Sequence, residues 1–424
     1  MVNKHLRNAL QNLAILLLSL SALFLISRLP LFHTSWAAQV QSLLVPRPAD
    51  GDQTQAGGPE EMFPAVHVMV TSDIEYGRYG QLHVDGADPL LDQLIPLFQE
   101  ALGSATELGA AADKTLREAL EEPGLYLDLT GQLPLEVAAA WLGEEVELER
   151  DVRSMALTCE EEDAVLYLRS EAGEIFRCAT ALPASAVREV CAGLSPNGST
   201  FAYETNYAPL APYTVLVAEA EDAPAVQGDL PAAYSTYNLL TALDFNPHTV
   251  FRYTESSGAE VVEESPRTLR ISPDGAVSFN SRGEAAAPLY QVRASAGDKP
   301  EAREALRAAW GLAEALTEGA GASPLRLRAV EEREDGWTIF FRYQTQGLPV
   351  YFSDEGDALS VIITGGAITA FSYRCRAYTA LEETAALLPP DMAQAIASLY
   401  PGAGLSIGYV DSGAGEMTAQ WLAR

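Results

Sequence analysis

The chain has 424 residues, which is enough for two or three domains with substantial cores. Its 58 aspartates and glutamates against 27 lysines and arginines give a net charge of -31, and the acidic residues are spread along the sequence. Such a surface repels a phosphate backbone, so the composition argues against nucleic acid as a partner.

The N-terminus carries the first clear pattern, in which Lys4 and Arg7 precede an apolar run from Leu13 to Ile26. With its flanks this run reaches the roughly 20 residues that a membrane helix needs. The basic residues favour a cytoplasmic tail over 1–12, a transmembrane helix over 13–33 and an exported body. We therefore predict a single-pass protein of the cell membrane. A cleaved secretory signal ending near Ala37 is the alternative, and it also exports the body.

A spacer rich in proline and glycine over 34–62 leads to the first exported domain, which we assign to 63–222. Hydrophobic periodicity predicts strands over 66–70, 77–84, 124–129, 164–169 and 175–179. The helices that it predicts lie over 89–102, 112–122, 135–142 and 183–194. Helices and strands do not alternate regularly here, so we predict an α+β domain.

Prolines between 205 and 231 mark a boundary, and beyond it one plan occurs twice. Each copy is a helix followed by an antiparallel meander, and we assign the copies to a central domain, 223–298, and a C-terminal domain, 299–424. The predicted helices lie over 231–243 and over 300–316, the second one capped by Gly319, and the meanders over 250–279 and 325–374. Further helices are expected over 381–387 and 390–399, with a last strand over 405–410. The predicted class is α+β with antiparallel sheets.

Four cysteines follow the apolar segment, and in an oxidising compartment Cys159 and Cys178 would be able to close a hairpin. Alternatively, all four are buried thiols, because spacing alone does not set connectivity. None of them forms a CxxC pair, so neither a redox site nor a zinc ribbon is predicted.

No catalytic constellation emerges from the sequence. The five histidines form no HExxH motif, and there is no GxSxG, SxxK or glycine-rich phosphate loop. We interpret His67 as a strand residue, and the run Glu160-Glu-Glu-Asp163 as solvated surface. We therefore predict no catalytic residue, no metal and no cofactor.

Tyrosines gather near the boundary at 205–231 and form a candidate interaction surface. Tyrosine is common at recognition surfaces, although packing between domains explains such rings equally well. The candidates are Tyr203, Tyr207, Tyr213, Tyr234 and Tyr237.

The segment Phe245-Asn-Pro-His-Thr-Val-Phe-Arg-Tyr-Thr-Glu255, with Arg267-Thr-Leu-Arg-Ile-Ser-Pro-Asp-Gly275, resembles the YycH family of membrane-anchored regulators. Gly124-Leu-Tyr-Leu-Asp-Leu129 and Gly347-Leu-Pro-Val-Tyr-Phe352 resemble the same group, and the late domains are also similar to YycI proteins. The resemblance implies a non-enzymatic single-span protein that contacts a WalK (YycG)-type sensor histidine kinase. Together with a YycI-like partner it would adjust cell-wall homeostasis.

The resemblance also implies that the kinase is contacted through the membrane helix. The candidate contact residues are Leu13, Leu16, Leu17, Ser19, Leu20, Ser21, Leu23 and Phe24. The two serines either hydrogen-bond to a neighbouring helix or bond back to their own backbone. The alternative function is an extracytoplasmic binding module that captures a cell-wall fragment or peptide at the tyrosine-rich boundary.

Overall fold

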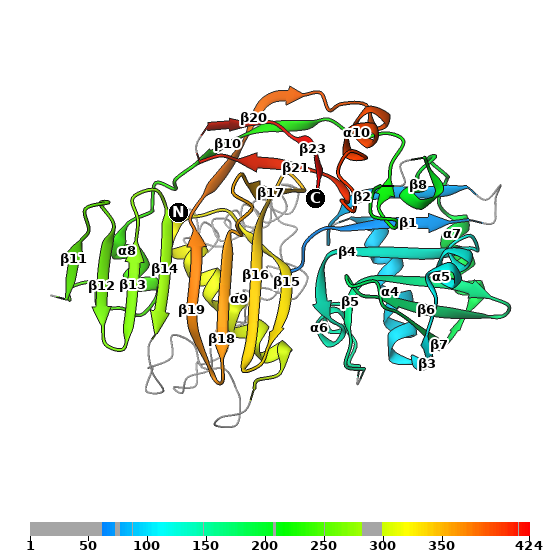
Figure 1. The fold of residues 1–424 in the computed structure, drawn as a ribbon, viewed down its shortest axis with the longest axis horizontal. Coiled ribbons are helices and arrows are strands. Elements are labelled where there is room, and N and C mark those ends of the chain that lie inside the picture. Colours follow the sequence, from blue (N-terminus) through cyan, green and yellow to red (C-terminus); the bar gives the residue numbers. More distant parts are fainter. Residues whose placement is uncertain are drawn as a thin grey trace, which may run out of the picture. The chain divides into compact units, whose positions relative to one another are not determined.

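The computed structural model describes residues 62–72, 77–86, 88–146, 148–206, 209–249, 251–281, 299–413 and 415–424 (Figure 1). The predicted membrane helix over 13–33, with its contact residues from Leu13 to Phe24, lies outside these ranges. Among the described residues, no helix combines the length and the apolar character that a membrane crossing requires. The described part is a mixed α+β structure with mostly antiparallel sheets, which confirms the predicted class.

A seven-stranded antiparallel sheet in the order β2-β1-β4-β5-β6-β7-β3 forms the first part of the body. Its strands are β1 (Val66–Thr71), β2 (Arg78–Val84), β3 (Thr106–Ala110), β4 (Gly124–Pro134), β5 (Asp151–Glu160), β6 (Asp163–Arg169) and β7 (Ile175–Pro183). We did not predict β3 or β5. The buried run Ser154–Cys159 in β5 lacks the alternation that marks a half-exposed strand, because both faces of this sheet are covered.

Helices cover one face of this sheet, and α5 covers the other together with a short hairpin. The helices are α4 (Pro89–Gly103), α5 (Asp113–Ala119), α6 (Leu135–Trp141) and α7 (Ala184–Ala192), and the hairpin is β8 (Thr200–Phe201) with β9 (Val215–Leu216). Leu125 and Leu127 of β4 pack in the core of α4, α6 and α7, whereas Tyr126 packs with Leu116 of α5. The period-two alternation of β4 therefore feeds two cores.

The second large sheet has eleven strands, and its antiparallel β14–β19 pair joins the two predicted meanders. Its strands are β11 (Arg252–Thr254), β12 (Glu260–Glu264), β13 (Arg267–Ile271), β14 (Ala276–Ser281), β15 (Leu325–Arg333), β16 (Gly336–Thr345), β17 (Leu348–Phe352), β18 (Leu359–Thr364), β19 (Ala367–Arg374), β21 (Leu405–Asp411) and β23 (Gln420–Ala423). At the joint Phe279 lies opposite Phe371, and their rings stack 5.3 Å apart.

Helices α8 (Thr236–Ala242) and α9 (Ala302–Ala320) lie side by side behind this sheet (Figure 1). The predicted cap at Gly319 is wrong, because α9 continues to Ala320 and Gly321, with φ 68°, is the capping residue. Gly319 serves the packing instead. A Cβ atom there would lie 2.6 Å from Cβ of Ala242, so the absence of a side chain lets the two helices approach closely.

A three-stranded sheet formed by β10 (Ala223–Asp229), β20 (Ala377–Ala385) and β22 (Gly415–Met417) completes the body, with helix α10 (Pro390–Ala397) after β20. The helix predicted over 381–387 is wrong, because β20 continues through Ala385 and Ala380, Thr384 and Ala385 pair with β10. A partner strand distant in sequence overrides the helical preference of Leu381-Glu-Glu-Thr-Ala385.

The two large sheets meet where β4 touches β15, and hydrogen bonds tie them together on either side. The Ala65 N–H donates to Oε1 of Gln344 at 3.4 Å, and the Ala302 N–H at the start of α9 donates to Oε1 of Glu136 at 3.1 Å. This junction determines the position of the site described next.

Candidate functional site

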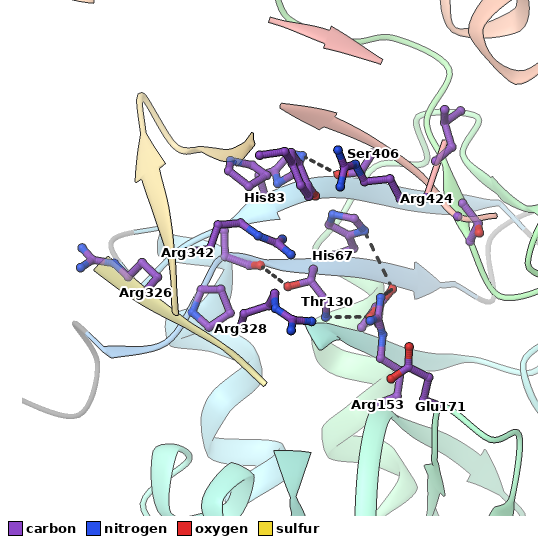
Figure 2. Close-up of a pocket in the computed structure, with 18 of the residues that line it drawn as sticks. His67, His83, Thr130, Arg153, Glu171, Arg326, Arg328, Arg342, Ser406 and Arg424 are labelled. Atoms are coloured by element: carbon purple, nitrogen blue, oxygen red, sulfur yellow. Dashed lines mark hydrogen bonds and ion pairs between the residues drawn. The ribbon is translucent and has the colours of Figure 1, made fainter. Parts of the chain in front are cut away.

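A cavity of about 650 Å³ lies at the junction of the two large sheets (Figure 2). One wall comes from β1, β2, β4, β5 and β6, and the other from β15, β16, β17 and the loop at 355–358. Segments 211–214 and 402–406 complete the lining. Its volume lies within the range of small-molecule binding sites.

The lining of this cavity is rich in arginine, although the chain as a whole is strongly acidic. Six of the chain's 27 basic residues line it, against four carboxylates. The arginines are Arg153, Arg169, Arg326, Arg328, Arg342 and Arg424. The carboxylates are Asp128, Glu171, Glu355 and Asp357. The cavity is therefore a local positive region in a protein with a net charge of -31.

Two of these arginines are neutralised by carboxylates of their own wall. Arg153 donates from Nε and Nη2 to the two oxygens of Asp128, at 2.7 and 3.3 Å. Arg328 meets Asp357 in the same two-pronged way, at 2.6 and 3.2 Å. Burial raises the pKa of Asp128, but Arg153 and His67 outweigh it, so the pKa lies below its ordinary value. These pairs fix both walls and leave little charge for a ligand.

Three other arginines are held by tyrosine rings and not by carboxylates. Arg342 and Arg424 each place the guanidinium carbon 4.3 Å from the centre of the Tyr351 ring, and Arg169 places its own 4.7 Å from the centre of the Tyr213 ring. Within the part of the chain that the structure describes, none of the three has a carboxylate partner within 4.0 Å. A ring positions a guanidinium through its face without consuming the N–H donors.

Two histidines lie between these charged groups. The rings of His67 and His83 meet edge to face at 5.0 Å, and Nε2 of His83 lies 3.4 Å from the Ser406 hydroxyl. Burial lowers the pKa of His67 to about 4, against the opposing effect of Asp128, and burial also lowers the pKa of His83. Both rings are therefore neutral near pH 7. Nε2 of His67 is buried and has no hydrogen-bond partner among the described residues.

The candidate tyrosines fall into separate places. Tyr203 and Tyr213 lie in one aromatic cluster with their rings 5.7 Å apart, and of the two Tyr213 lines the cavity. Tyr234 donates a hydrogen bond to the Ser272 carbonyl at 2.6 Å, whereas Tyr237 on α8 is 57% exposed. Tyr207 lies outside the described residues.

Sequence reasoning did not predict the arginine lining. The one local signal was Leu325-Arg-Leu-Arg328, whose period-two alternation places two arginines on the polar face of a strand. The remaining arginines come from strands and segments far apart in the sequence, so no spacing indicates that they meet.

The described ranges contain no group of three or more histidine, cysteine or acidic side chains placed to hold a metal ion. The four cysteines are all buried, and no disulfide joins them in the described chain. A comparison with protein-family models, curated proteins and solved structures finds no match to this chain. The geometry of the cavity therefore carries the functional argument.

Proposed function

We propose that the exported body is a non-enzymatic binding module and that the arginine-lined cavity holds a small anionic ligand. The observation that carries this proposal is the set of three guanidinium groups, Arg169, Arg342 and Arg424, which rest on tyrosine rings without a carboxylate partner in the described chain. Each offers N–H donors of the kind that bind carboxylate and phosphate in pairs.

The surroundings strengthen this argument. A protein with a net charge of -31 repels anions at long range, so an anion site needs concentrated local positive charge. Arg342 is only partly exposed, and a hydrogen bond to a charged group in such a place is worth about 1.5 to 3 kcal/mol. Binding of a cell-wall fragment or peptide that carries carboxylates would use the same groups.

The histidine and carboxylate at the cavity favour binding over acid–base catalysis. The pKa of His67 is about 4, and the pKa of Asp128 lies below its ordinary value. Efficient proton transfer needs a group whose pKa lies near the working pH. Neither group meets that condition near neutral pH, which supports a non-enzymatic role.

The test uses the full chain in detergent, with its thermal unfolding followed by tryptophan fluorescence. Phosphate and glutarate are expected to raise the unfolding midpoint, whereas the neutral diamide of glutarate is expected not to. Arg342→Gln should abolish most of the increase. Arg333→Gln is the matched control, because Arg333 is an exposed residue of the same sheet outside this cavity. Equal shifts in both variants, or no shift with either anion, would overturn the proposal.

A second proposal is the membrane-anchored regulator of a WalK (YycG)-type sensor kinase, acting with a YycI-like partner. It is supported by the order of elements, in which α8 precedes β11 to β14 and α9 precedes β15 to β19. That twofold order is what the resemblance of the late domains implies. A ligand in the cavity would supply the input, and differential contact of about 1 to 3 kcal/mol with two kinase states would suffice for regulation.

The kinase contact is tested by a membrane two-hybrid assay with the sensor kinase of the same organism. The full chain is compared with a version whose residues 9–32 are replaced by an unrelated span. Association that disappears with the foreign span is the expected result. Lack of association with either version would rule out the regulator.

A further inference from the structure

We infer that the ligand carries two separate negative groups and bridges the two sheets. One group would be bound by Arg342 and Arg424 beside Tyr351, and the other by Arg169 beside Tyr213. This inference rests on the proposed anion-binding function and narrows its ligand to dianions with an uncharged middle.

The first subsite belongs to the eleven-stranded sheet. Arg342 lies on β16 and Tyr351 on β17, and Arg424 is fixed beside them because its backbone exchanges hydrogen bonds with Gly404. Arg328 lies nearby, but its charge is already paired with Asp357. Burial lowers the pKa of Arg342, and the positive charges of Arg328 and Arg424 lower it further. Because two cations share one ring without a carboxylate between them, an anion placed there would relieve their repulsion.

The second subsite belongs to the seven-stranded sheet. Arg169 ends β6 and rests on the Tyr213 ring, which is fixed because its hydroxyl donates to Oδ1 of Asp113 at 2.8 Å. The neighbouring Arg153 is occupied by Asp128. Arg169 is therefore the unneutralised cation of this wall.

The space between the subsites is lined by uncharged groups. Figure 2 shows His67 between the side chains of Arg342 and Arg153. His83 interacts electrostatically with both Arg342 and His67, and His67 in turn with Arg153. The two histidines are neutral, whereas Glu171 and Glu355, which also line the cavity, are exposed to solvent. A ligand with charge at both ends and none in the middle fits this order of groups.

The experiment measures binding to the full chain in detergent by calorimetry. The probes are α,ω-alkanedicarboxylates of increasing length, each paired with its monomethyl ester, which has one charge fewer at the same length. We expect one length to bind best and its ester to bind roughly tenfold or more weakly, as expected for loss of a charge-assisted contact. Alkane bisphosphonates of matched length form a second arm that distinguishes phosphate from carboxylate groups.

The variants separate the two subsites. Arg342→Gln and Arg169→Gln should each reduce the affinity for the diacid to about that for the ester, and the double variant should abolish binding. Arg333→Gln should bind as the unaltered chain does. Equal affinity for diacid and ester, lost in Arg342→Gln alone, would overturn the two-group ligand but leave anion binding in place. No binding of any probe would overturn both.

Discussion

Gly131 of β4 and Arg328 of β15 bring the two large sheets into direct backbone contact. A Cβ atom added at Gly131 would lie 1.7 Å from the carbonyl oxygen of Arg328, far inside any permitted contact. Thr130, just before it, has φ 59°, and its N–H donates to Oδ1 of Asp128 at 2.8 Å. The same turn thus positions the Asp128–Arg153 pair on one wall and fixes how closely the opposite wall approaches.

Substitution of Gly131 by alanine should therefore separate the sheets. We expect Gly131→Ala to lower the free energy of unfolding by about 1 to 3 kcal/mol, as overpacking does, and to weaken anion binding. Urea unfolding measures the first effect and calorimetry the second. Gly193→Ala is the control, because its new Cβ would meet the nearest atom at an ordinary 3.4 Å. An unchanged Gly131→Ala protein would show that the contact does not hold the sheets in place.

The neutral His67 should make stability depend on pH. The unfolded chain takes up a proton on this ring near pH 6.5, whereas the folded chain does so only near pH 4, so stability is lost as the pH falls between these values. The shift corresponds to about 3 kcal/mol at full extent. His67→Gln should remove this part of the slope in urea unfolding measured at pH 7 and pH 4.5. His248→Gln, an exposed histidine, should leave it unchanged. A slope that persists in His67→Gln would contradict the prediction.

The buried hydroxyl of Tyr343 should contribute measurably to stability. It donates to the Arg374 carbonyl at 2.7 Å and accepts from the Arg376 N–H at 3.1 Å, where the chain leaves β19 for β20. Tyr343→Phe leaves both backbone groups without this partner, so we expect a loss of about 1 to 3 kcal/mol in unfolding free energy. Tyr253→Phe, at an exposed site, should change it by less than about 0.5 kcal/mol. Equal losses in the two variants would refute the role of this hydroxyl.

The ring of Tyr351 should matter more for binding than for stability. Tyr351→Leu removes the surface on which Arg342 and Arg424 rest, and each such contact at a partly exposed site is worth about 0.5 to 1 kcal/mol. The unfolding free energy should fall by about that amount, whereas anion affinity should fall further because both guanidinium groups lose their positions. Calorimetry with the best dicarboxylate measures this effect. Unchanged affinity in Tyr351→Leu would exclude the ring from the site.

Local pattern determined much of the secondary structure. The alternation in Val66–Val70 and Gly124–Leu129 and the helical spacing in Pro89–Leu102 predict elements that the structure contains. It failed at β20, where Leu381–Ala385 pairs with β10 more than 150 residues earlier. Propensity acts over a few residues, and a partner strand so distant leaves no mark in the local sequence.

The sequence by itself determined the acidic surface, the α+β class with antiparallel strands, and the short-range turns and caps, because these depend on residue type and near neighbours. The tertiary structure alone decided the cavity. Arg169, Arg342 and Arg424 are far apart in the chain, and only the contact of β4 with β15 brings their walls together. Whether an arginine is a solvated surface charge or a binding group depends on which carboxylates and rings surround it in space, and spacing along the chain does not contain that information.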